Sequence, residues 1–181
     1  MDFRNYYHLE SYLFDTVRPR FMKQGYLDAF DFFCIVIWKA QRAKSKIAMK
    51  LQKVDEDLDR AVSVLTYGLA QQSNGKERLH LLWEADFNLP MASAILTVLY
   101  PDEFTVYDTN VCNMLGGFHN LKNISNFEAL WRGYQDFKCN VEESAPSKLS
   151  LRDKDRYLWG KSFYEQLTKD IKRGFRKPQK R

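Results

Sequence analysis

Apolar residues recur every three or four positions along most of the chain, the spacing that places them on one face of an α-helix. Strand-like alternation is confined to residues 104–107. A short apolar segment begins at Asp108 and stops at Gly116 and Gly117. We therefore expect an all-α fold with about eight helices. Longer segments with helical spacing cover residues 5–17, 29–53, 55–72, 76–85, 91–100, 126–137 and 151–173.

Polar residues that favour helix starts stand in front of several of these segments. Asp28, Ser125 and Ser150 occupy positions typical of an N-cap, where a side-chain oxygen accepts a bond from a free backbone N–H. Asp55 and Glu56 open their segment with negative charge, which the helix dipole favours. Breaks are expected at residues 73–75, 87–90, Pro101, 140–148 and Gly174.

The composition is that of a folded, slightly basic protein. The 181 residues are 45% hydrophobic and 15% aromatic, enough for one sizeable domain or two small lobes. The net charge of +5 and the pI near 9.0 favour a polyanionic partner. Cys34, Cys112 and Cys139 are widely spaced and belong to no CxxC or Cys/His cluster. We expect neither a disulfide framework nor a metal or other cofactor.

The sequence gives no indication of a membrane or export signal. The first ten residues lack an apolar segment of the kind found in signal peptides. The apolar run over residues 32–38 is too short to span a bilayer. We expect a cytoplasmic monomer that does not enter a membrane.

Asp108 is the candidate for chemistry, because it follows a β-branched and aromatic run and opens a new apolar segment. One interpretation makes it the N-cap of a helix after an αα-hairpin. Another makes it a carboxylate directed into a cleft. The two look the same in sequence, since a helix N-terminus both accepts an Asp side chain and keeps it ionised.

Three stretches carry a resemblance to a known family. They are DFNLPMASAIL followed by VYDTNV, WKAQR at residues 38–42, and LSLRDKDRYLWGKS at residues 149–162. In this order they resemble the HhH-GPD superfamily of DNA glycosylases, and within it bacterial proteins similar to 8-oxoguanine glycosylases. The resemblance spans residues 30–165 and implies that Asp108 is the catalytic aspartate of an enzyme acting on double-stranded DNA.

The resemblance also implies an architecture of two helical lobes with a cleft between them. Residues 28–107 would form a central lobe that ends in a helix-hairpin-helix. Residues 1–27 and 108–170 would form the second lobe, and 171–181 a basic tail. Asp108 would stand where the lobes meet.

A base must leave the duplex to reach such a site, so the enzyme needs a pocket with stacking surfaces. The expected pocket residues are Trp38, Arg42, Trp83, Tyr107, Arg152, Asp155 and Trp159. The expected contacts to DNA come from Asn88, Leu89, Pro90, Met91 and Asn110. Each of these aromatic residues has an alternative interpretation as a core residue. Arg156 and Asp153 are interpreted as solvated ions.

The chain departs from the family pattern in the hairpin and at the usual lysine. The two hairpin glycines fall at Asp86 and Asn88, and Asn88 is expected to take the left-handed backbone. The nucleophilic lysine of bifunctional members would stand 18 residues before Asp108, where this chain has Pro90. Hydrolysis without a lyase step is therefore expected. Lys39 is the lysine that would supply the nucleophile if a lyase step occurred. It also fits the alternative interpretation as a lysine on a solvated helix face.

Three functions remain open at this point. The first is a monofunctional DNA glycosylase, in base excision repair or directed at modified foreign DNA. The second is a DNA-binding module that has lost catalysis. The third is a helical protein-interaction domain without a nucleic-acid partner.

Overall fold

A computed structural model describes residues 3–175, and these residues form helices and connecting segments with no strand. The all-α prediction is confirmed. Residues 176–181 of the predicted basic tail lie outside the described part. The α-helices are α1 (Leu9–Tyr12), α2 (Arg18–Gln24), α3 (Ala29–Ala40), α4 (Lys44–Leu51), α5 (Leu58–Gln71), α6 (Gly75–Glu84), α7 (Leu89–Leu99), α8 (Thr109–Leu115), α9 (Phe127–Ser144) and α10 (Leu151–Lys172).

Four shorter helical turns connect these elements: η1 (Phe3–Tyr6), η2 (Leu13–Val17), η3 (Gln41–Ala43) and η4 (Leu121–Asn123). The turn η2 is π-helical, and the N–H of Arg18 bonds to the carbonyl of Leu13 five residues earlier. Pro19 follows directly and has no N–H to donate. The predicted helix over 5–17 is therefore the first part of a longer helical run that reaches Gln24.

The predicted helix over 29–53 is divided in two, and the break comes directly after Trp38 and Lys39. Ala40 has an extended backbone with φ of −161°, which ends α3, and the chain passes through η3 before α4 begins. The break was not predicted, because alanine is the strongest helix former and carries no stop signal. Its consequence is that Lys39 stands at the end of a helix.

Helix caps follow the predictions at three places and differ at two. The side chains of Asp28, Asp108 and Ser150 accept bonds from backbone N–H groups of the helices they precede. The cap of α9 is Asn126 rather than Ser125. This helix also continues to Ser144, through part of the predicted loop over 140–148, because buried Val141 extends its apolar stripe by one turn. The cap of α5 is Asp57.

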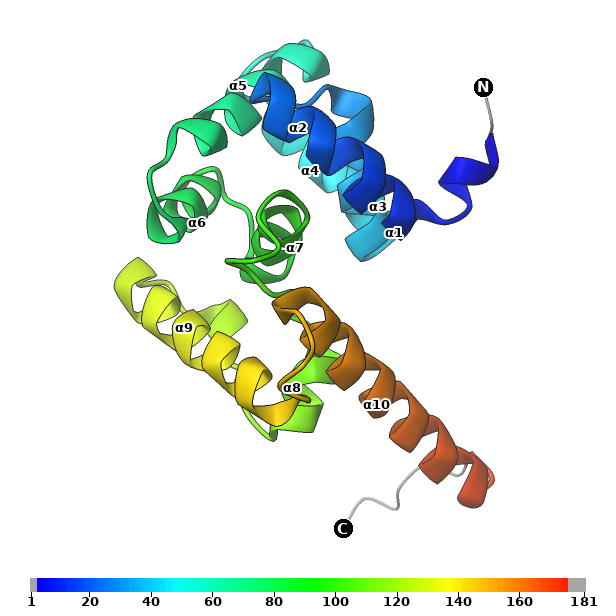
Figure 1. The fold of residues 1–181 in the computed structure, drawn as a ribbon. Coiled ribbons are helices and arrows are strands. Elements are labelled where there is room, and N and C mark those ends of the chain that lie inside the picture. The colour runs from blue at the N-terminus through cyan, green and yellow to red at the C-terminus, as the bar shows by residue number, and fades with distance from the viewer. Residues whose placement is uncertain (1–2, 176–181) are drawn as a thin grey trace.

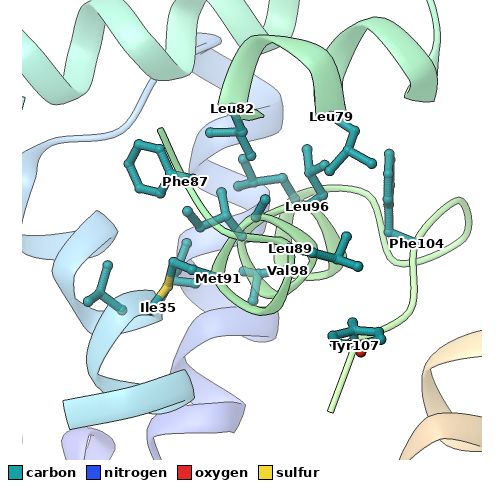
Figure 2. Packing of buried hydrophobic residues seen from close by; sticks show 14 of the residues in the cluster. Ile35, Leu79, Leu82, Phe87, Leu89, Met91, Leu96, Val98, Phe104 and Tyr107 are labelled. Atoms are coloured by element: carbon teal, nitrogen blue, oxygen red, sulfur yellow. The ribbon is translucent and has the colours of Figure 1, made fainter. Parts of the chain in front are cut away.

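Helix α7 occupies the centre of the molecule, with α1 to α6 on one side and α8 to α10 on the other (Figure 1). Every residue from Met91 to Leu99 is buried. A helix that is apolar on all sides needs partners all around it. Figure 2 shows side chains of α7 packed between Ile35 of α3, Leu79 and Leu82 of α6, and the segment that carries Phe104 and Tyr107.

The N-terminal helices are fixed to α3 by one buried carboxylate. Asp31 is fully buried and accepts bonds from the Tyr12 hydroxyl, at 2.6 Å, and from the Arg20 guanidinium. A buried charge needs such partners, because burial without them is strongly unfavourable. This anchor holds α1 next to α3. Within residues 3–175, no helix combines the length and apolar character needed to cross a bilayer.

Candidate active site

Asp108 and Lys39 form an ion pair at the junction of α8 and α3. The Lys39 Nζ donates to Asp108 Oδ2 at 2.7 Å and to the carbonyl oxygen of Tyr107 at 3.3 Å. The other oxygen, Oδ1, accepts from the Asn110 N–H at 2.9 Å, which is the N-cap bond of α8. The Lys39 side chain is only 12% exposed, so it is not the solvated helix-face lysine of the alternative interpretation.

The extended segment before Asp108 is fixed from both sides. The Tyr134 hydroxyl accepts from the Thr105 N–H at 3.1 Å and donates to the Thr105 carbonyl at 2.7 Å. The Tyr107 N–H donates to the Ser93 hydroxyl of α7 at 2.9 Å. These bonds satisfy backbone groups that form no strand pairing, and they set the direction in which Asp108 leaves the core.

The ion pair borders a cavity of about 630 Å³, a size typical of ligand pockets. Six predicted site residues line it, namely Trp38, Lys39, Asp108, Asn110, Arg152 and Trp159. Four further residues complete the lining: Glu10, Val106, Val111 and Arg156. The cavity thus draws on the N-terminal helix, the end of α3, the start of α8 and the first turns of α10.

Arg152 is the central cation of the cavity wall. Its guanidinium pairs with Glu10 and with Asp155, and its Cζ lies 5.2 Å from the centre of the Trp38 ring and 5.3 Å from that of Phe14. Such placement over aromatic rings stabilises a cation beyond its ion pairs. Glu10 also accepts from Arg156 Nε, at 3.2 Å. One carboxylate from α1 therefore joins two arginines of α10.

Asp155 was expected in the base pocket, but it lies behind the cavity wall. It is 3% exposed, and its Oδ2 accepts from the Val106 N–H and the Thr105 hydroxyl, both at 3.1 Å. Burial raises the pKa of Asp155 to about 6, against the opposing effects of Arg152 and these two hydrogen bonds. Its contacts make it a support for Arg152 and for the segment that precedes Asp108.

Three other residues expected in the pocket do not line the cavity. The Trp83 ring packs on His80 and Phe127, with centroids 5.8 and 5.6 Å away, which places it against the start of α9. Tyr107 is buried, and its hydroxyl donates to the carbonyl of Phe118 at 2.6 Å. Arg42 is exposed in η3. For Trp83 and Tyr107 the alternative interpretation as core residues fits these contacts.

The hairpin between α6 and α7 differs from its predicted backbone. Asp86, not Asn88, takes the positive φ, at 62°. Asn88 has φ of −69° and caps α7, accepting from the Met91 N–H at 3.1 Å. The capping bond requires an extended backbone at Asn88, which excludes the left-handed one. Leu89 and Met91 are buried, so their side chains contact the core rather than the surface.

Sequence reasoning missed Glu10. Arg156 is exposed, as the solvated interpretation expects, and it also lines the cavity. Glu10 lies in the first turns of the chain, and its partner Arg152 is 142 positions away. No local pattern signals such a contact. Asp153 has the expected solvated role, since it accepts from the Ser150 N-cap hydroxyl at 2.8 Å and pairs with Arg156 at 3.0 Å.

Residues 3–175 contain no group of three or more His, Cys, Asp or Glu side chains arranged to hold a metal ion. No protein-family model, curated protein or solved structure matches this chain.

Proposed function

We propose that the protein is a DNA glycosylase, which hydrolyses the N-glycosidic bond of a damaged or modified base in duplex DNA. The observation that carries the proposal is the Asp108 carboxylate, paired with Lys39 and bordering a cavity that Trp38 and Trp159 also line. The cavity has the size, the aromatic surface and the cations that a base taken out of its stack requires. Excision in repair and attack on modified foreign DNA both fit this reaction.

Asp108 is the residue proposed to stabilise the transition state. Loss of the base leaves positive charge on the sugar, as in other glycoside hydrolysis. A fixed carboxylate stabilises that charge, since its orientation is set before the reaction begins. Here the bond from Asn110 N–H fixes one oxygen and the Lys39 ammonium fixes the other.

Lys39 is proposed to position Asp108 rather than to attack the sugar. As an ammonium it has no free electron pair for a bond to the anomeric carbon, and both Asp108 and the Tyr107 carbonyl accept its protons. Water is then the nucleophile, so the product is an abasic site in an unbroken strand. Pro90, at the position of the usual lysine, supports the same conclusion.

The arginines and Glu10 are proposed to contact the extruded base. Arg152 and Arg156 offer N–H donors and Glu10 offers acceptors, and all three line the cavity. We further propose two lobes, residues 28–107 as one and residues 1–27 with 108–170 as the other, and that the DNA lies along the cleft between them. The positive net charge of +5 is consistent with a DNA partner.

A panel of duplexes, each carrying one lesion or modified base, tests this function. Abasic sites should form in at least one duplex, and strand breaks should appear only after alkali. The Asp108→Asn variant should form none while it still binds that duplex. The second candidate function is a DNA-binding module without catalysis. Salt-dependent binding without processing of any duplex on the panel would favour it over the glycosylase. The departures at Asp86 and Pro90 favour that candidate.

A further inference from the structure

A run of basic residues begins at the active-site lysine and continues along α4. Between Lys39 and Lys53 the chain has no acidic residue, and six positions are basic: Lys39, Arg42, Lys44, Lys46, Lys50 and Lys53. The side chains of Arg42, Lys44, Lys46 and Lys53 are exposed, whereas Ile47 and Leu51 pack α4 onto the core. The exposed residues of this run therefore carry positive charge and no negative charge of their own.

Three lysines of this run, Lys46, Lys50 and Lys53, act on Asp86 in the hairpin turn. Lys50 Nζ pairs with Asp86 Oδ2 at 2.7 Å and also bonds to the Asp86 carbonyl. The pKa of Asp86 is lowered, first by the hydrogen bond from Lys50 and further by the charges of Lys46 and Lys53. Asp86 is 85% exposed, and within residues 3–175 its only ion-pair partner is Lys50. The charges of Lys46 and Lys53 are therefore available to bind another anion.

The N-terminus of α7 has few free backbone N–H groups with which to bind a phosphate. Of its first three residues, Pro90 has no N–H, and the N–H of Met91 is already bonded to the Asn88 side chain. A helix N-terminus binds anions through free N–H groups, so this one is largely occupied. The exposed Asp86 carboxylate next to it would also repel a phosphate, were it not paired with Lys50.

We propose that the exposed lysines Lys46 and Lys53 bind the DNA backbone beside the hairpin, in place of the hairpin's own amide groups. Lys50 neutralises Asp86 and so allows a phosphate to approach. The inference rests on the proposed function, because it names the part of the surface that holds the duplex while the base occupies the cavity. It assigns the contact to side-chain charge, which is independent of base sequence.

Salt dependence of binding to an undamaged duplex tests the assignment. The double variant Lys46→Gln, Lys53→Gln should reduce the slope of log affinity against log salt by about 0.9 for each phosphate that the protein no longer neutralises. The control is Lys23→Gln, Lys148→Gln, which removes the same charge at two exposed positions elsewhere and should leave the slope within about 0.5 of the wild type. Equal slopes for the two double variants would overturn the proposal.

The variant Asp86→Asn gives a second test, in which the affinity for the duplex should rise rather than fall. Asparagine tolerates the positive φ of 62° at this position, so the turn is expected to keep its shape. Removing the negative charge should tighten duplex binding severalfold, and weaker binding contradicts the proposal. None of these measurements requires base excision. A protein that binds through Lys46 and Lys53 but excises nothing would contradict only the enzymatic function.

Discussion

Lys39 and Asp108 are separated by 69 positions in the sequence, yet Lys39 Nζ lies 2.7 Å from Asp108 Oδ2. Their side chains are 12% and 26% exposed, so the pair is partly shielded from water while it still borders the cavity. Each oxygen of the carboxylate has a different donor. The aspartate is thus held in one orientation, which is the condition that the proposed electrostatic role requires.

Replacing Asp108 with asparagine separates chemistry from structure. Asparagine is as good an N-cap as aspartate, so the expected loss of unfolding free energy is that of the partly shielded ion pair with Lys39, about 1–3 kcal/mol. Under the proposed mechanism, excision should fall by at least about 100-fold, because the variant lacks the charge proposed to stabilise the sugar cation. Single-turnover excision kinetics and thermal unfolding of the same samples measure the two effects. A variant that folds and retains full activity would show that the carboxylate is only a cap.

Borohydride reduction distinguishes the two roles open to Lys39. Reduction of an imine would leave the protein covalently bound to DNA, and we expect no such product from the wild type. The Lys44→Met variant, which changes an exposed lysine nearby, is the control for Lys39→Met. A trapped product that persists in Lys44→Met and vanishes in Lys39→Met would mean that Lys39 attacks the sugar and that hydrolysis alone is wrong.

The Tyr134 hydroxyl should make a large contribution to the free energy of unfolding for a single polar group. It bonds both the N–H and the carbonyl of Thr105 and is fully buried. Tyr134→Phe leaves these backbone groups without a partner, so the free energy of unfolding should fall by about 2–3 kcal/mol. The control Tyr157→Phe, at a 43% exposed tyrosine, should change it by less than about 0.5 kcal/mol. Equal effects in denaturant titrations would mean that Thr105 is not held this way.

Asp155 should titrate near neutral pH. Burial raises its pKa to about 6 from the ordinary 3.8, so protonation favours the folded state. Its contribution to stability is complete below about pH 4 and is lost as the pH rises through 6. The stability of the wild type relative to Asp155→Asn should therefore fall over that range, by up to about 3 kcal/mol. Denaturant titrations of both proteins at several pH values measure the difference.

The ion pair with Arg152 gives the same group a second test. Arg152 opposes the effect of burial, so removing its charge in Arg152→Met should raise the pKa of Asp155 further. Carboxyl-carbon NMR titration of both proteins reports the direction of the shift. A pKa that falls in the variant would contradict the lowering effect assigned to Arg152.

Local chemistry determined much of what could be predicted. A cap is decided within about four residues, and Asp28, Asp108 and Ser150 therefore revealed their helices from sequence. The apolar spacing likewise predicted an all-helical chain. The break at Ala40 and the positive φ of Asp86 were missed, because neither residue type demands that conformation and the surrounding packing imposes it.

The sequence by itself determined the all-helical class, the caps Asp28, Asp108 and Ser150, and the candidacy of Asp108. Only the tertiary structure decided which side chains meet Asp108. It brought Lys39 from α3 to the carboxylate and joined Glu10 to Arg152 and Arg156. It also placed Tyr107 in the core and packed the partly buried Trp83 against it. The physical reason is distance along the chain. Hydrogen bonds within a helical turn follow from neighbouring residues, whereas contacts between helices depend on how every buried face packs at once.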